Sequence, residues 1–548
     1  MSEQAILFDT RSIQRYIFSG NTLKTNIGAS YLVDHIFGDI LLGKVLSPEH
    51  RDKYEISSVD FTSWQTAAEP VKTLPADCYV AYIGGGNALL LFRKKEDDYR
   101  KDIVTAFTMQ LLVDCPGLKT GAAIGDIDLS SPEKFQTSLN QMYALLKQNQ
   151  NTVFPRVNVP YTGLTLACDV NGEAANFYDT EGLIDKTPRF FSQEVRAKTQ
   201  AAMDANIELR SKFKEQLGGV YHFPMELDKL GQREPKNDIA IVHIDGNQMG
   251  VRFSSCQNLA ERSQLSREVK EQTEKAFANL LDTITKEYSK YKEFLDLKNN
   301  YLPIRPLILG GDDVTFVCPA QMAITYAKRF MDFMNQDLGI LTVGGSKQIS
   351  SCAGVAILPT AYPFFRGYQL AEQLCDAAKA KSRKDASTCW LDFAILHGEQ
   401  APELSQIRQN EYTGALGNMH FGPYRVDDDT DKYALTALIR CASVFRDALP
   451  SSKVKGMGFV REYDHRKKNE IILPSSKVKG MRFVLQHGKA DIHTFMEQWH
   501  HQNLEMPDIP QWENYTSELW YGADGAPLET PYVDAIEMMD YILPEFAG

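Results

Sequence analysis

The chain has 548 residues, of which 43% are hydrophobic and 24% are charged, with a formal net charge of −12 at pH 7. This length accommodates three or four domains, and the composition is that of an ordinary globular protein. The acidic balance argues against an extended non-specific nucleic-acid surface, although it is compatible with a local basic patch.

Nothing in the sequence indicates export or membrane insertion. The start, MSEQAILFDT, lacks a basic segment followed by an apolar one, and no apolar run approaches the roughly 18–20 residues that span a bilayer. The 9 cysteines are dispersed singly without a C-x-x-C pair, which favours reduced thiols over disulfides or a zinc site. We therefore expect a cytoplasmic protein without a membrane partner.

The first motif in chain order is a short apolar strand, Ile6–Phe8, that ends on Asp9. We expect Asn26–Ser30 to open an amphipathic helix, because apolar residues recur after it with helical spacing. Two apolar segments then flank Gly84-Gly85-Gly86-Asn87, which predicts a β-hairpin with a glycine-rich turn. A charged helix and a further strand follow this hairpin. The next segment, 171–236, is predicted to be a linker with one helix, Gln193–Leu217.

A second apolar strand, Ile239–Ile244, ends on Asp245 and is followed by a loop that contains Gly246 and Asn247. A carboxylate at the end of a central strand suits a metal ion, and the free backbone N–H groups of such a loop suit phosphate oxygens. A long charged helix follows near Leu259–Tyr291. We expect its charged face to be solvated and held by pairs of side chains four residues apart.

The stretch 304–319, IRPLILGGDDVTFVCP, carries the most informative motif. Its apolar halves predict two strands with a tight Gly310-Gly311 turn, and Asp312 and Asp313 stand at the start of the outgoing strand. A solvated turn would also use glycine and aspartate. Together with Asp245, however, the two acids match the order of a palm, strand-Asp, helix, hairpin-Asp-Asp, that carries out two-metal nucleotidyl transfer.

A helix with one apolar face, 366–385, ends in a basic cluster that includes Lys379 and Lys381. Lysines in a last helical turn are expected from the helix dipole alone. The functional alternative is that Lys379 or Lys381 reaches across to a triphosphate held by the acids. The strand Cys389–Phe393 then closes the domain.

The two hairpin-containing segments share their order of elements. We therefore predict an α/β (α+β) fold with two ferredoxin-like βαββαβ palm domains, at 1–170 and 237–400. Residues 401–548 are predicted to form a mainly helical C-terminal region.

Two further features belong to this C-terminal region. The nonapeptide LPSSKVKGM occurs at 449–457 and again at 473–481, a duplication to which the sequence assigns no role. His493, His500 and His501 share one helical segment, but no cysteine or acid completes a zinc site around them.

Several of these motifs together resemble the palm-domain polymerase/cyclase family that includes the large subunit of type III CRISPR effector complexes. The motifs are the opening DTRSIQRYIFSG with LKTNIGAS, then IDGNQMG and LGGDDVTFVCP, and finally SCAGVAILPTAYPFFRGYQLAEQLCDAAKAK followed by WLDF. They cover most of 1–170 and 237–400.

This resemblance implies two palms that face each other and a Mg²⁺-dependent (or Mn²⁺-dependent) enzyme. Its substrate would be ATP or another NTP, and its product a cyclic oligoadenylate, a second messenger of antiviral defence. Other CRISPR effector subunits and guide or target RNA are implied as partners. In the residues carried over by motif, Asp245, Asp312 and Asp313 would hold the metals, Gly310 and Gly311 would let the nucleotide approach, Lys379 would contact phosphate, and Lys24 and Ser30 would contact a nucleotide across the palm interface.

The chain also departs from this family. It has no His-Asp nuclease motif, since Asp34-His35 has the reverse order, and no cysteine-ligated zinc element. A reduced, stand-alone member is therefore plausible. A second hypothesis is a non-catalytic scaffold or RNA-binding subunit of a CRISPR ribonucleoprotein, because the Gly84–Asn87 hairpin shows that a palm here has lost its acids. A diguanylate cyclase would need an aromatic residue where this chain has Val314, and a processive polymerase would need a basic duplex channel.

Overall fold

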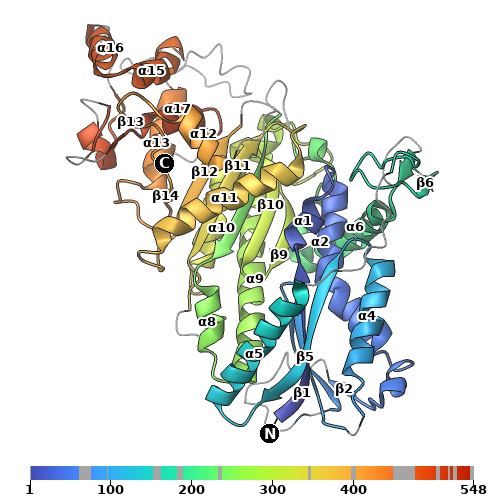
Figure 1. Ribbon diagram of the computed structural model, residues 1–548. Helices are drawn as coiled ribbons and strands as arrows, with labels where there is room; N and C mark the ends of the chain where they lie inside the picture. Colours follow the sequence, from blue (N-terminus) through green and yellow to red (C-terminus); the bar gives the residue numbers. More distant parts are fainter. Residues whose placement is uncertain are drawn as a thin grey trace.

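The computed structural model describes residues 2–60, 74, 76–95, 97–151, 162–180, 182, 189–231, 237–343, 347–396, 403–447, 475–501, 506–515, 519–522 and 527–543. Two mixed α/β units, each built on one sheet, are followed by a C-terminal region (Figure 1). The fold class predicted from the sequence is thereby confirmed.

The N-terminal unit is a sheet with helices packed against it. Its elements are β1 (Ser2–Arg11), α1 (Ile13–Phe18), α2 (Leu23–His35), the π-helix η1 (Ile36–Val45), the 3₁₀ helix η2 (Arg51–Tyr54), β2 (Val59–Asp60), β3 (Cys78–Gly84), β4 (Asn87–Phe92), α4 (Arg100–Asp114), β5 (Lys119–Asp128) and α5 (Pro132–Gln150). The sheet order is β2-β3-β4-β1-β5, and β1 runs antiparallel to both β4 and β5. The order β3-β4-β1-β5 is that of a ferredoxin-like βαββαβ unit.

The second unit repeats this topology. Its elements are β8 (Ile239–Gly246), α8 (Met249–Ser255), α9 (Leu259–Phe294), β9 (Arg305–Gly310), β10 (Asp313–Pro319), η4 (Ala320–Met322), α10 (Ala323–Met334), β11 (Ser351–Leu358), α11 (Phe364–Ser382) and β12 (Trp390–Ile395). The sheet order is β14-β12-β11-β8-β10-β9, so that β9-β10-β8-β11 correspond to β3-β4-β1-β5 of the first unit. The neighbours of β8 are antiparallel to it, as β4 and β5 are to β1.

The alternation of side chains along β8 assigns the two faces of the second sheet. Ile241 and His243 face α11, because a Cβ at Gly367 would lie 2.9 Å from the Ile241 side chain and the His243 ring lies 5.5 Å from the ring of Tyr368. Asp245 has the same parity and points to the same face. The helices α9 and α10 pack against each other on the other side of the sheet.

The segment between the two units was predicted to be a linker, but its main helix is part of the N-terminal unit. The segment contains β6 (Phe177–Asp179), β7 (Arg189–Phe191), α6 (Gln193–Lys212), α7 (Lys214–Leu217) and η3 (Leu227–Lys229). α6 packs along α2 so closely that a Cβ at Gly28 would lie 1.6 Å from the carbonyl oxygen of Lys198. The glycine of the NIGAS motif therefore has a packing role.

The sequence predicted that this motif opens a helix, but in the structure the motif lies inside α2. α2 begins three residues earlier, at Leu23, where the side chain of Thr22 accepts a hydrogen bond from the backbone N–H of Thr25. Ser131, Ser192 and Asn258 cap α5, α6 and α9 in the same way. Such side chains satisfy backbone donors that the first helical turn leaves unpaired.

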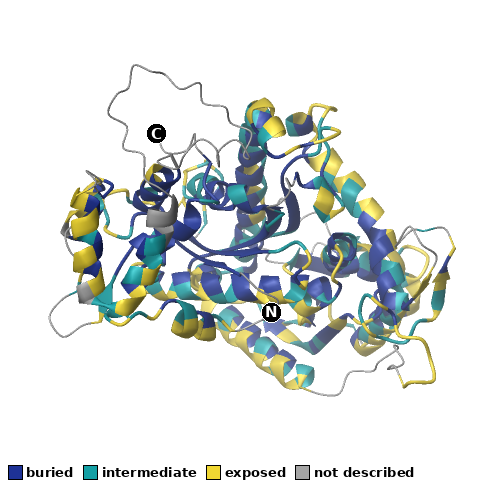
Figure 2. Cartoon of the chain, turned by 90° about the horizontal axis from the view of Figure 1, so that it is seen from above, coloured by how far each residue is buried: buried dark blue, intermediate teal, exposed yellow. Residues whose placement is uncertain are grey.

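The long helix α9 contacts both units, and it has a buried face besides the charged face that the sequence predicted. It has a continuous buried face and contacts β3 of the first unit as well as β9 of the second. Seen from above, the strands at the centre of the molecule are buried, whereas the helices around them also carry exposed residues (Figure 2). The hydroxyl of Ser263 donates to the carbonyl of Ala81 at 2.5 Å, and Arg262 donates to the hydroxyl of Tyr143 at 3.0 Å. The spacing of charges along α9 concealed this face, because its buried positions include glutamine, threonine and glutamate.

The C-terminal region is mainly helical, as predicted, but it also extends the second sheet. It contains α12 (Leu404–Glu411), β13 (Gly417–Asn418), β14 (Tyr424–Arg425), α13 (Leu435–Asp447), α15 (Ser475–His487), α16 (Lys489–His501), η6 (Pro510–Tyr515), β15 (Leu528–Glu529) and α17 (Tyr532–Met538). β14 pairs with β12, so a boundary at residue 400 cuts through a continuous sheet. The first copy of LPSSKVKGM, at 449–457, lies outside the described residues.

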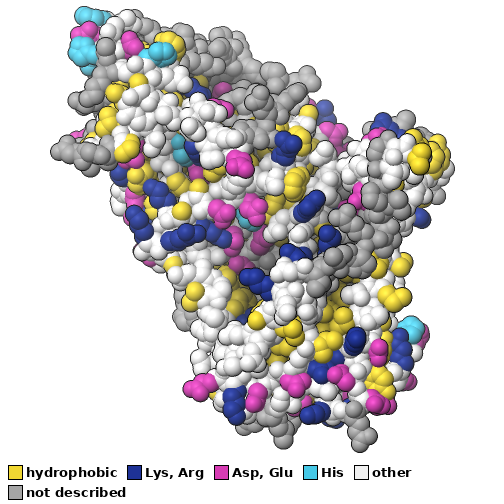
Figure 3. All heavy atoms as spheres, viewed as in Figure 1, with side chains coloured by type: hydrophobic (Ala, Val, Ile, Leu, Met, Phe, Trp, Pro, Cys, Tyr) yellow, Lys and Arg dark blue, Asp and Glu magenta, His cyan; other side chains and the backbone are white. Residues whose placement is uncertain are grey.

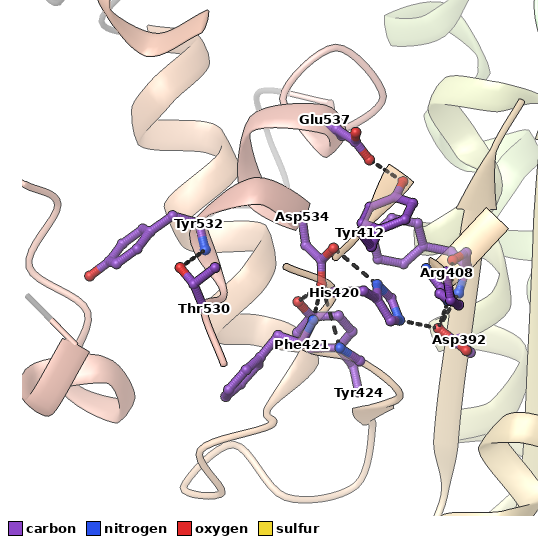
Figure 4. A network of polar contacts seen from close by, with 12 residues as sticks. Asp392, Arg408, Tyr412, His420, Phe421, Tyr424, Thr530, Tyr532, Asp534 and Glu537 are labelled. Carbon is purple, nitrogen blue, oxygen red and sulfur yellow. Dashed lines mark hydrogen bonds and ion pairs between the residues drawn. The ribbon is translucent and has the colours of Figure 1, made fainter. Parts of the chain in front are cut away.

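A buried polar network fastens this region to the second unit (Figure 4). His420 lies between two carboxylates, with Nε2 2.8 Å from Asp392 of β12 and Nδ1 3.0 Å from Asp534 of α17. Burial and Arg408 oppose a charge on His420, but the two aspartates prevail and raise its pKa. Tyr424 also donates to Asp534, at 2.6 Å. The network therefore joins three segments that are far apart in the sequence.

Among the described residues, no helix is both long enough and apolar enough to cross a membrane.

Candidate active site

The three acids singled out by the sequence are brought together at one end of the second sheet. Asp313 is the first residue of β10 and pairs directly with Asp245 of β8. The turn of the hairpin consists of Gly311 and Asp312, not of two glycines as predicted, because Gly310 still pairs with Asp313. Gly311 has a φ of 62°, a conformation that glycine adopts without strain. Asp312 therefore stands at the tip of the hairpin and not in the strand.

Gly246 provides the space in which Asp312 lies. A Cβ at Gly246 would come within 2.9 Å of the Cβ of Asp312 and 3.4 Å of its Oδ2. The side chain of Asp312 thus packs against Gly246, the residue that follows Asp245 in the strand. On the other side of the hairpin, the hydroxyl of Thr273 in α9 donates to the carbonyl of Gly311. Both contacts fix the position of the turn.

Lys379 lies in this cluster, as one reading of the sequence proposed. Its Nζ forms an ion pair with Oδ2 of Asp245. Burial opposes the charge of Lys379, but Asp245 outweighs it and raises the pKa of the lysine. In Figure 3, acidic side chains gather beside basic ones in the middle of the visible face, around α11.

His243 lies beneath the acids and was not identified from the sequence. Its Nδ1 is 3.1 Å from the hydroxyl of Thr315 and 3.4 Å from Oδ1 of Asp313. Burial lowers the pKa of His243 to about 4, so the ring is neutral at physiological pH. The signal for such a residue is its parity, since His243 and Asp245 lie on the same face of β8.

The acids destabilise one another's negative charge. Burial, followed by the charge of Asp245, raises the pKa of Asp312 to about 7. The same two causes, together with Asp312 itself, raise the pKa of Asp313. Oδ1 of Asp313 is buried without a hydrogen-bond partner among the described residues. The cluster therefore has more negative charge than its own donors compensate.

This electrostatic strain predicts a pH dependence of stability. Asp312 has a pKa of about 7 in the folded chain, against 3.8 when it is unperturbed. The protonated carboxyl therefore contributes its full share to the stability of the folded state below pH 3.8. This contribution to the free energy of unfolding is lost as the pH rises through about 7. We expect Asp312→Asn, which cannot ionise, to melt near wild type in acid and above it at alkaline pH. Melting curves of both proteins in EDTA measure this, and a difference that is the same at every pH would contradict it.

A pocket of about 430 Å³ opens between the two units and is lined by both hairpins. Asp312 and Asp313 line it from the second unit, and Gly85, Gly86 and Asn87 line it from the first. A second pocket, of about 230 Å³, shares part of this lining and adds Arg262, Arg267 and Lys270 of α9. The residues common to both pockets are Asp34, Gly85, Asn87, Gly310 and Asp312. The volume of the larger pocket is within the range typical of small-molecule sites.

The first unit retains one acid at the corresponding position. Asp9 pairs with Asn87 in the register that relates Asp245 to Asp313. Its carboxylate accepts a hydrogen bond from the side chain of Gln150 at 2.6 Å. The strand does not end on Asp9, as predicted, but continues to Arg11. A lone acid beside Asn87 lacks the carboxylates that a two-metal site requires.

Three of the predicted nucleotide-binding residues are placed elsewhere. Asn247 donates its backbone N–H to Ser350 at 2.8 Å and its side-chain amide to the carbonyl of Thr388 at 3.0 Å, so its donors hold the loop. Nζ of Lys381 lies 4.4 Å from the ring centre of Tyr433, away from the acids. Lys24 is in the first turn of α2 and does not line either pocket.

Ser30, in contrast, lines the larger pocket, two turns along α2 from Lys24. The sequence missed the opposite wall of this pocket, which includes Glu208 and Lys212 of α6 and Arg305 of β9. Asp34 and His35, which have the reverse order of a nuclease motif, also line it.

The chemistry of the cluster fits a divalent cation. In the described part of the chain, no three His, Cys, Asp or Glu side chains are arranged as a ready metal site. Asp245 instead forms an ion pair with Lys379. The unsatisfied Oδ1 of Asp313 and the raised pKa of Asp312 nevertheless indicate carboxylates that a cation would stabilise. Hard oxygen ligands of this kind are those that Mg²⁺ prefers.

Fold and site together define a palm-domain protein. Residues 238–388 match the family model of the second palm domain of Cas10/Cmr2. The chain therefore carries a palm of the family to which the large subunit of type III CRISPR effectors belongs. A search of curated proteins gives no match to this sequence.

Among solved structures, the chain is similar to Csm1–Csm4 cassettes and to Csm1. A cassette in complex with cA4 shares 13% identity at a TM-score of 0.40, over 72% of this chain and 54% of that one. A cassette in complex with pppApA shares 11% sequence identity at a TM-score of 0.47, and the match covers 98% of this chain and 69% of that one. Csm1 in T. onnurineus shares 13% sequence identity at a TM-score of 0.40, and the match covers 71% of this chain and 53% of that one. The chain thus spans about half the length of the first of these structures.

Proposed function

We propose that this protein is a Mg²⁺-dependent nucleotidyltransferase that converts ATP into a cyclic oligoadenylate in a type III CRISPR-like defence. The observation that carries the proposal is the shared pocket: the acidic hairpin of one palm and the glycine-rich hairpin of the other line the same space. One nucleotide can therefore lie against the acids while a second lies against the first palm.

The reaction joins two nucleotides in this pocket. The 3′-hydroxyl of the acceptor gives up its proton to solvent and its oxygen forms a bond to the α-phosphorus of the donor. The bond from that phosphorus to the oxygen bridging to the β-phosphate breaks, and pyrophosphate leaves. Asp245, Asp312 and Asp313 would hold Mg²⁺, which when bound lowers the pKa of the hydroxyl and stabilises the charge of the leaving group.

The residues of the chain contribute positioning and charge. Lys379 is held at the site by Asp245, and we expect its ammonium group to bind the donor phosphates. Gly310 and Gly311 leave the turn without side chains, and a Cβ at Gly310 would meet only Ile308, at 3.8 Å. The backbone of the hairpin is therefore accessible to a phosphate.

The proposal is tested by incubating the purified chain with each NTP and Mg²⁺ or Mn²⁺ and identifying the products by mass spectrometry. We expect cyclic or linear oligoadenylates from ATP. If no NTP gives a product under any of these conditions, also when other effector subunits and target RNA are supplied, the chain is a non-catalytic subunit and the proposal is wrong.

A further inference from the structure

Arg305, the first residue of β9, is a buried cation without a counter-ion. It is 1% exposed. Its Nη1 donates to Oδ1 of Asn206 at 2.7 Å, while Nε has no partner. No described carboxylate forms an ion pair with it, and burial alone lowers its pKa, to about 9. The guanidinium is therefore charged at neutral pH.

A charge in this position is unusual. Ions buried in proteins are normally paired, because an unpaired buried ion loses its hydration without compensation. The other charged side chains in this wall of the pocket are paired with residues other than Arg305. Glu208 lies 2.9 Å from His35, and Lys212 forms an ion pair with Glu274 at 2.9 Å. The ring of Phe223 lies 5.8 Å from the guanidinium carbon of Arg305, but no described carboxylate balances the charge, which is thus available to an anion from outside the chain.

Arg305 lines the same pocket as the acids, at its other end. β9 runs along the wall from Arg305 to Gly310, and five residues of strand span about 17 Å. The wall between them is apolar, with Leu307, Ile308 and Leu309. On the facing wall, the ring of Tyr31 stacks on His35 at 3.9 Å. A ligand that reaches both ends must be extended, and it must be anionic at the end that contacts Arg305.

We propose that Arg305 binds the 5′-phosphate chain of the acceptor nucleotide, whose 3′-hydroxyl is presented to Asp312 and Asp313. This inference rests on the proposed function. In a nucleotide the 3′-hydroxyl and the 5′-phosphates lie on opposite sides of the sugar, so an acceptor that lies along β9 directs its phosphates away from the acids. Arg305 then selects 5′-phosphorylated acceptors over nucleosides and stabilises a second anion outside the metal site.

The experiment measures binding of inorganic tripolyphosphate to the full-length chain in EDTA, where no cation can bridge the ligand to the acids. We expect tripolyphosphate to raise the melting temperature of wild type. Arg305→Met should weaken this binding at least tenfold. Because the arginine has no ion pair to lose, the ligand-free variant should melt at or above wild type. Arg329→Met is the matched control: its guanidinium is paired with Glu287 at 2.7 Å and lies outside this pocket, so binding should be unchanged.

A merely structural role gives the opposite pattern. If Arg305→Met melts below wild type but binds tripolyphosphate equally well, Arg305 only anchors β9 to α6 and the inference is overturned. Should Arg305→Met not fold, Arg305→Gln keeps a hydrogen bond to Asn206 without the charge, and unchanged binding by it overturns the inference equally.

A variant of Asp312 separates this inference from the proposed function. Asp312→Asn should bind tripolyphosphate in EDTA as wild type does. If the chain makes no product but binding still depends on Arg305, the anion site stands and the catalytic proposal falls. If the chain is active and Arg305→Met changes neither tripolyphosphate binding nor the KM for ATP, the anion site falls alone.

Discussion

Asp312→Asn is expected to form product from ATP at least 100-fold more slowly than wild type in the presence of Mg²⁺. Asparagine keeps the shape of the side chain but removes the negative charge from the tip of the hairpin. A contact that stabilises charge in the transition state is typically worth about 3 kcal/mol, which corresponds to roughly 100-fold in rate. The initial rate of product formation, followed by chromatography or mass spectrometry, measures the effect.

The control for this variant is an acid that lies on another surface. Asp332 of α10 pairs with Lys328 at 2.8 Å and lines neither of the two pockets between the palms. Asp332→Asn should therefore retain wild-type activity within about twofold. A rate for Asp312→Asn within a few-fold of wild type would remove Asp312 from the catalytic site.

The strands and the hairpin that form the site could be predicted, because each has a recognisable local sequence pattern. An apolar strand that ends on Asp245, and two apolar strands around Gly310–Asp313, are each recognisable within about ten residues of sequence. Pairing of β8 with β10 then places Asp245 opposite Asp313. The turn itself was misassigned by one residue, since both Gly-Gly and Gly-Asp fit a two-residue turn by composition.

The choice between Lys379 and Lys381 required the structure. Two residues along a helix turn the side chain by about 200°, so only one of the two lysines can face the acids. The apolar face of α11, which packs on the sheet, decides which one does. Lys381 instead lies over Tyr433, whose position depends on the C-terminal region. Contacts between distant segments of this kind leave no local pattern.

The wall formed by α6 and Arg305 could not be predicted either. The sequence of α6 is that of an ordinary charged helix. The only sequence feature that reflects its close packing on α2 is Gly28, which lies in another segment. Arg305 precedes an apolar strand and looks like a surface residue at the end of it. Its burial arises because α6 and the first palm cover the edge strand β9.

Because Gly246 lies against Asp312, we expect a substitution of Gly246 to have a large effect on turnover. In Gly246→Ala, the new Cβ would lie 2.9 Å from the Cβ of Asp312 and 3.2 Å from Cγ of Met249. Real Cβ atoms do not approach this closely, so the hairpin tip must move. A displacement of about 1 Å in a reacting group can lower a rate by roughly 100-fold. We expect turnover to fall by at least about tenfold while the melting temperature changes by only a few degrees, because the shifted turn is at the end of the sheet.

Gly250, four residues further along in α8, is the matched control. A Cβ there meets nothing within 4 Å, and its backbone is helical. Alanine is favoured over glycine in a helix by up to about 1 kcal/mol, so Gly250→Ala should melt slightly higher than wild type and keep its turnover. Steady-state rates and melting curves of the two variants, measured side by side, separate displacement of Asp312 from a general effect of the extra methyl group. Equal turnover in both variants would mean that Gly246 does not position the hairpin acid and that the catalytic arrangement of Asp312 differs from the one described.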